Sequence, residues 1–215
     1  MKNNQSGRSM IEMLGVLAIV GVLSVGGVMG YSKAMGKFKT DQTVTQMAEL
    51  SIGIRNLFFQ QKEFTGLDER MIINAGLVSK RMLLDTSNSN ASLGSLIVNP
   101  LGGNFRVFPS PGGLGRDNAF EIYADKLSRE ACITLASNDW GNDPASGLVA
   151  IYAGAAVGGV TAPLMTTVYS GAGSNPSAGV FTPGKHENSL PISPMVALSA
   201  CTCSNNDCIF GIKYQ

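Results

Sequence analysis

The first 31 residues of the chain read MKNNQSGRSMIEMLGVLAIVGVLSVGGVMGY. From Met13 to Tyr31 this stretch runs for 19 residues without a charged side chain. As a helix rising 1.5 Å per residue it would be about 28 Å long, which matches the roughly 30 Å apolar core of a bilayer. A secretory signal has a shorter apolar core of about 7 to 15 residues, followed by a small-residue cleavage site. The stretch therefore predicts a membrane helix.

Basic residues flank this span on both sides. Lys2 and Arg8 precede it, whereas Lys33, Lys37 and Lys39 follow it. By the positive-inside rule, this count narrowly favours a cytoplasmic position for the C-terminal side.

The cysteines argue for the opposite orientation. All four lie far from the span, and three of them fall within the last 15 residues: Cys132, Cys201, Cys203 and Cys208. They lack the paired CxxC spacing of a zinc ribbon, and their even number favours disulfides in an oxidising compartment. We give the cysteines more weight than the small difference in basic residues.

One carboxylate interrupts the apolar sequence. Glu12 is flanked by Ile11 and Met13, and a carboxylate in a membrane helix costs up to about 3 kcal/mol on insertion scales. Two interpretations stay open. Glu12 reaches the interface at the end of the span, or it pairs with a positive group inside a helical assembly.

The residues from Gly7 to Glu12, GRSMIE, follow a short polar leader and precede the apolar helix. In this arrangement the chain resembles the type IV prepilins. The resemblance implies that a membrane peptidase cuts after Gly7 and methylates the new N-terminal amine on Arg8. It also implies that Glu12 pairs with the N-terminal amine of a neighbouring subunit during filament growth. Arg8 departs from the family pattern, which usually has Phe or Met there, but the spacing of Gly7 and Glu12 is intact.

An amphipathic helix is predicted to continue beyond the span. No proline occurs from Ser32 to Lys62, and apolar residues recur at spacings of three and four, typical of one helix face: Met47, Leu50, Ile54, Leu57 and Phe58. We expect one helix from about Ser9 to Lys62; the alternative is two helices broken near Thr40. These features divide the whole chain into four segments. They are a leader at 1–7, an apolar membrane or filament-core helix at 8–31, its amphipathic continuation at 32–62, and a globular head at 63–215.

The head is expected to mix short helices and strands, with a turn at Asn99–Gly103 and a Ser/Asn-rich loop at 85–95. The expected helices are 67–75, 78–84 and 127–135, the last with Ser128 as N-cap; the expected strands are 105–108, 119–123, 148–152, 160–169 and 208–214. The terminal strand is expected to lie inside the sheet.

This order of elements is similar to the type IVb pilins. The resemblance implies an α+β fold in which the long N-terminal helix packs on an antiparallel sheet. It also implies that a disulfide closes a large C-terminal region, from Cys132 to Cys201 or Cys208. Proximity in sequence favours pairing Cys203 with Cys208 and Cys132 with Cys201, although four cysteines allow three connectivities. The short leader differs from the long one usual in that subclass.

Composition argues against several other functions. The chain carries 16 Lys and Arg against 15 Asp and Glu, a net charge of +1, so it lacks the basic field of a nucleic-acid reader. Its one histidine, His186, excludes His-rich metal sites and leaves little support for a cysteine nucleophile. The glycine runs at 112–115 and 171–173 lack the context of a phosphate loop, and the oxygen-rich stretch at 138–143 lacks the EF-hand spacing. We expect no enzymatic activity, no metal and no cofactor.

These observations together favour a structural subunit of a type IV pilus. Such a subunit is expected in the bacterial inner membrane before assembly and then in an extracellular filament built from copies of itself. The other expected partners are prepilin peptidase and the pilus assembly machinery of the inner membrane. The alternatives are a type II secretion pseudopilin or minor pilin and, outside this class, a signal-anchored periplasmic binding protein or hydrolase.

Overall fold

The structure is a computed structural model, and it describes residues 6–61, 63–84, 96–112, 116–141, 146–155, 160–166, 179–183, 190–203 and 206–215, with side chains from Met10 onward. The chain divides into two compact units, residues 1–39 and 40–215. The boundary falls within the first helix.

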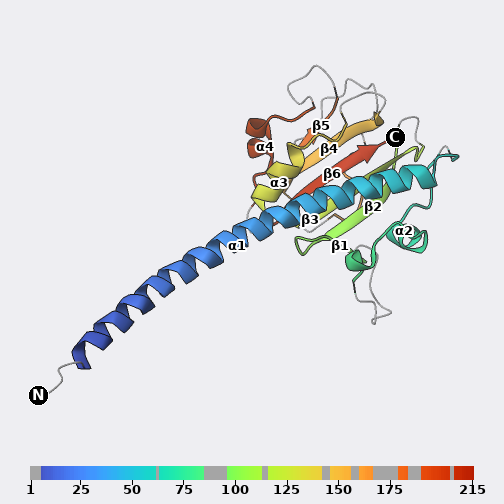
Figure 1. Cartoon of the computed structure of the whole chain (residues 1–215). Coiled ribbons are helices and arrows are strands. Elements are labelled where there is room, and N and C mark those ends of the chain that lie inside the picture. The colour runs from blue at the N-terminus through green and yellow to red at the C-terminus, as the bar shows by residue number, and fades with distance from the viewer. Residues whose placement is uncertain are drawn as a thin grey trace, which may run out of the picture. The chain divides into compact units, whose positions relative to one another are not determined.

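Helix α1, Ser6–Leu57, is continuous (Figure 1), so the two-helix alternative with a break near Thr40 is wrong. It ends before the predicted end at Lys62, which lies outside the described residues. The chain turns at Phe58, whose side chain is buried and packs on Phe64 with ring centroids 5.1 Å apart. This aromatic contact brings the chain back toward the core where periodicity alone predicted more helix.

In the described part of the head, six strands form one antiparallel sheet. In spatial order they are β1 (Ile97–Val98), β2 (Asn104–Ser110), β3 (Ala119–Leu127), β6 (Cys208–Tyr214), β4 (Leu148–Ala155) and β5 (Val180–Phe181). The C-terminal strand β6 lies between β3 and β4, with Ile212 opposite both Ile122 and Ile151. The expectation that the terminal strand lies inside the sheet is confirmed.

One predicted strand is wrong. Val160 to Thr166, the described part of the predicted strand at 160–169, is irregular, and β5 is the strand that pairs with β4. The backbone of Leu164 and Met165 bonds to buried side chains of the sheet and not to a neighbouring strand. The predicted loop at 85–95 lies outside the described residues.

Short helices cap the head. They are α2 (Glu69–Asn74), the 3₁₀ helix η1 (Lys80–Met82), α3 (Arg129–Ala136) and α4 (Pro194–Ala200). Ser128 is the N-cap of α3, as the sequence predicts, because its hydroxyl accepts from the Ala131 amide at 3.2 Å. Helix α4 was not predicted, and the predicted helix at 78–84 shrinks to η1.

The sheet separates a large core from a small one. On one face, Met47, Leu50 and Ile54 of α1 pack with Ile122 and other apolar residues of the central strands. On the opposite face lies a smaller cluster: Tyr123, Val149, Ala150, Val160, Met165, Val180 and Ile209. Side chains alternate between the two faces along a strand, so the second face of β3 carries Glu121 and Tyr123.

Candidate functional site

The N-terminal part of α1 is apolar all around its circumference. Its large side chains have exposed fractions of 52–75%: Met10, Ile11, Met13, Leu14, Val16, Leu17, Ile19, Val20, Val22, Leu23, Val25, Val28, Met29 and Tyr31. The helix has a stretch of mean hydropathy 2.2 that is long and apolar enough to cross a membrane, and none of that stretch is buried within the chain. A helix that is hydrophobic on every side belongs in an apolar environment, either lipid or other protein.

The same part of the helix is rich in glycine. Gly15, Gly21, Gly26, Gly27 and Gly30 each have open space where a Cβ would be, because no described atom apart from the adjoining residues and the local helix backbone lies within 4 Å. Glycine in a helix interior costs up to about 1 kcal/mol relative to alanine. The packing of a single chain therefore gives no reason for these glycines, whereas close approach of another helix would.

The three residues of the prepilin-like motif lie at the start of α1. Gly7 and Arg8 have helical backbone, and the Arg8 side chain lies outside the described part of the structure. Glu12 is exposed, and none of the ion pairs in the described part of the chain includes it. In a single copy, the described side chains thus leave Glu12 on the apolar surface without a cation partner.

The cysteines form two disulfides at the end of the head. Cys132 in α3 is joined to Cys201 after α4, with Cα atoms 6.0 Å apart, and Cys203 is joined to Cys208, with Cα atoms 5.2 Å apart. These are the pairs favoured by sequence proximity. Arg129 supports the first, because its guanidinium donates to the carbonyls of Cys201 at 3.0 Å and Leu198 at 3.2 Å.

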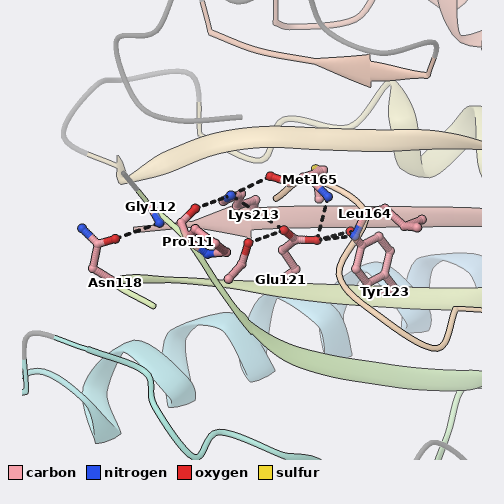
Figure 2. A network of polar contacts seen from close by, with 9 residues as sticks. Pro111, Gly112, Asn118, Glu121, Tyr123, Leu164, Met165 and Lys213 are labelled. Atoms are coloured by element: carbon pink, nitrogen blue, oxygen red, sulfur yellow. Dashed lines mark hydrogen bonds and ion pairs between the residues drawn. The ribbon is translucent and has the colours of Figure 1, made fainter. Parts of the chain in front are cut away.

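A buried ion pair lies on the second face of the sheet (Figure 2). Lys213 Nζ is 3.7 Å from Glu121 Oε1, and both side chains are fully buried. The ammonium also donates to the carbonyls of Pro111 and Met165, each at 2.7 Å. Burial lowers the pKa of Lys213, and the charge of Glu121 opposes that shift.

Glu121 collects further donors. Its carboxylate accepts from the hydroxyls of Ser110 and Tyr123 and from the amides of Leu164, at 3.0 Å, and Met165, at 3.1 Å. Burial, followed by the charge of Glu121, raises the pKa of the Tyr123 hydroxyl well above its usual value. The network therefore holds the backbone of residues 164 and 165 against the second face of the sheet.

Sequence reasoning missed this network. The signal was present, because a Glu and a Lys occupy positions inside the otherwise apolar runs AFEIYA and CIFGIKY. Charged residues are almost never fully buried unless paired, so these two positions call for a partner.

The enzyme-like features considered from sequence form no site in the described residues. In that part of the chain no group of three or more His, Cys, Asp or Glu side chains could hold a metal ion. Asp139 closes a local turn, accepting from the Gly141 amide at 2.9 Å. His186, residues 142–143 and 113–115, and the glycine run at 171–173 lie outside the described residues. A pocket of about 550 Å³ beside Arg55, Phe59 and Phe64 contains no catalytic grouping.

Comparison with known proteins identifies a matching family and solved structures with the same fold. The bundlin family model matches residues 33–187. No curated protein sequence matches the chain significantly. A type IVb pilin from Salmonella typhi shares the fold at a TM-score of 0.52 and 17% identity, covering 81% of this chain and 99% of that one. TcpA, a type IV pilin from the El Tor biotype of Vibrio cholerae, does so at 0.51 and 14% identity, with the same coverage.

Proposed function

This chain belongs to the bundlin family of type IVb pilins, and from that membership we propose that it is cut after Gly7 and then polymerised through α1 into an extracellular pilus. Its family and fold are those of structural pilin subunits and not of enzymes. Its proposed partners are copies of itself, prepilin peptidase, and the assembly machinery of the inner membrane.

The apolar surface of α1 carries the proposal. Burying a Val, Leu, Ile or Met side chain is worth about 1.5–3 kcal/mol each, and from Met10 to Met29 such side chains are exposed on every side of the helix. Water is therefore an unfavourable environment for this segment. Lipid covers it while the subunit is stored in the inner membrane, and the helices of other subunits cover it in the filament.

Glu12 is proposed to set the axial position of each subunit in the filament. An unpaired carboxylate inside an apolar helix bundle is costly, so a subunit docks best where a cation meets it. Cleavage after Gly7 creates such a cation, the amine of Arg8. Pairing of this amine with Glu12 of a subunit already in the filament relieves the cost only at one axial position.

The two disulfides support the location of the head. Disulfides persist in oxidising compartments, and Cys132–Cys201 and Cys203–Cys208 both lie in the head. The head is then on the outer side of the inner membrane before assembly, while the leader is on the inner side.

Mass spectrometry of the protein purified from sheared surface filaments tests the proposal. We expect a chain that starts at Arg8 with a methylated amine and carries two intact disulfides. Recovery of the chain only from membranes, still bearing residues 1–7, would contradict both cleavage and assembly. A processed chain that is rare in the filaments would instead favour a minor pilin or a pseudopilin.

A further inference from the structure

Two lysines, Lys33 and Lys37, closely follow the apolar part of α1. Lys33 and Lys37 are exposed, and none of the ion pairs in the described residues includes either of them. Four residues correspond to about 400° of helix, so the two side chains are only about 40° apart around the axis. Like charges at this spacing destabilise a helix, and the exposed Asp41 is at the favourable spacing of four residues only from Lys37, so a face carrying both lysines still favours an anionic partner.

Their distance from the apolar segment indicates where that partner lies. At 1.5 Å per residue, Lys33 is about 3 Å and Lys37 about 9 Å beyond Tyr31, which ends the uncharged span. The headgroup layer of a bilayer extends about 5–8 Å beyond the apolar core on each side. Long lysine side chains can also reach toward the interface. When the uncharged span fills the apolar core, both ammonium groups are level with the phosphates.

Their side of the membrane makes these lysines unusual. Basic residues close to a span favour the cytoplasmic side, yet the disulfides place the head that follows Lys33 and Lys37 in an oxidising compartment. The two lysines thus disfavour the orientation in which the head lies outside the cytoplasm. A favourable interaction of the lysines on the outer side would offset this unfavourable contribution.

We infer that Lys33 and Lys37 form a binding site for the phosphates of anionic phospholipids in the outer leaflet of the inner membrane. The site holds the stored subunit at a defined depth before assembly. This inference rests on the proposed function to the extent that α1 must be inserted in a membrane. The attraction is electrostatic. Each lysine near an anionic surface raises the association constant by about a factor of five, and salt weakens this effect.

Lipid selectivity of the full chain tests the inference. The protein is reconstituted in phosphatidylcholine vesicles that contain spin-labelled phosphatidylglycerol or spin-labelled phosphatidylcholine, and the relative association constant of the two labels is measured. We expect the wild-type chain to prefer phosphatidylglycerol, and Lys33→Gln/Lys37→Gln to lose most of this preference. Lys33→Arg/Lys37→Arg should keep it, because both charges remain.

A matched control removes two basic charges from the head. Lys80→Gln/Arg81→Gln changes the net charge equally at two exposed positions and should keep the lipid preference. An unchanged preference in Lys33→Gln/Lys37→Gln, or an equal loss in the control, would overturn the inference. Alkaline carbonate extraction of the same vesicles separates the two proposals. An inserted chain without lipid preference contradicts this inference alone, whereas an extractable chain contradicts membrane storage as well.

Discussion

Glu121 and Lys213 face each other directly across strands β3 and β6, as register partners whose charged atoms lie 3.7 Å apart in a fully buried site. Such a pair stabilises a fold only when further hydrogen bonds compensate its desolvation. Here the carbonyls of Pro111 and Met165 and the amides of Leu164 and Met165 supply them. The pair therefore joins the central strands to the segment that covers them.

Removing one charge of this pair should destabilise the head strongly. We expect Lys213→Met to lower the free energy of unfolding by about 3–5 kcal/mol, because Glu121 would stay buried without its cation. The double variant Lys213→Met/Glu121→Gln should lose less than the sum of the single changes. Guanidinium unfolding of the full chain in detergent measures this, with the exposed Lys80→Met as control. If the loss of unfolding free energy in the double variant equals the sum of the losses in Lys213→Met and Glu121→Gln, the two charges are not coupled.

Blocking the proposed cleavage should leave the leader attached. We expect Gly7→Val to retain residues 1–7, because a branched side chain replaces the glycine that the peptidase is proposed to require. Gly15→Val is the matched control, since it adds the same side chain in open space on the same helix, and it should be processed normally. Mass spectrometry of the membrane fraction distinguishes the two. A Gly7→Val chain that begins at Arg8 would refute the assignment of the processing site.

Loss of the Glu12 carboxylate should affect assembly alone. We expect Glu12→Ala to be cleaved and inserted in the membrane but to form few or no filaments, because the amine of Arg8 would lack its partner. Glu12→Asp should be intermediate, since the charge remains on a shorter side chain. Glu49→Ala removes an exposed carboxylate from the same helix and serves as control. Shear fractionation and electron microscopy give the filament yield, and a normal yield from Glu12→Ala would leave Glu12 as an interfacial residue.

The two disulfides should contribute unequally to stability. In the chain-entropy picture, the sequence separation of 69 residues between Cys132 and Cys201 is worth about 4 kcal/mol, and the separation of 5 between Cys203 and Cys208 about 2 kcal/mol. Replacing each pair by serine, one pair at a time, and following unfolding by denaturant tests this order. A larger loss from removal of the short pair would mean that native contacts, and not loop closure, set the ranking.

The C-terminal strand should weaken in alkali. Burial raises the pKa of Tyr214 to about 12, with Arg55 opposing the shift, while its hydroxyl donates to the Trp140 carbonyl at 2.7 Å. Because the folded state holds the phenol proton more tightly than the unfolded state, this stability is present below about pH 10 and is lost as the pH rises toward 12. The difference in unfolding free energy between the wild type and Tyr214→Phe should therefore shrink from pH 9 to pH 12. A constant difference would contradict the shift.

The apolar span and the Cys203–Cys208 pair could be predicted from the sequence because each depends on residues close together in the chain, whereas the processing site at Gly7 stays a prediction. Nineteen uncharged residues indicate a membrane helix wherever the rest of the chain lies. The spacing of Gly7 and Glu12 and the proximity of Cys203 and Cys208 are likewise local. The terminal strand was recognisable because six of its seven residues, all but Lys213, are apolar, aromatic or glycine.

Only the tertiary structure determined how distant segments meet. Helix α1 ends at Leu57 because Phe58 packs on Phe64, and residues 160–166 are irregular because their backbone bonds to Glu121 and Lys213 instead of a strand. The pairing of Glu121 with Lys213 depends on the register of β3 against β6, and a slip of one residue would turn either side chain to the opposite face. Periodicity and propensity describe a segment's own preference, but register and burial arise only when the segments pack.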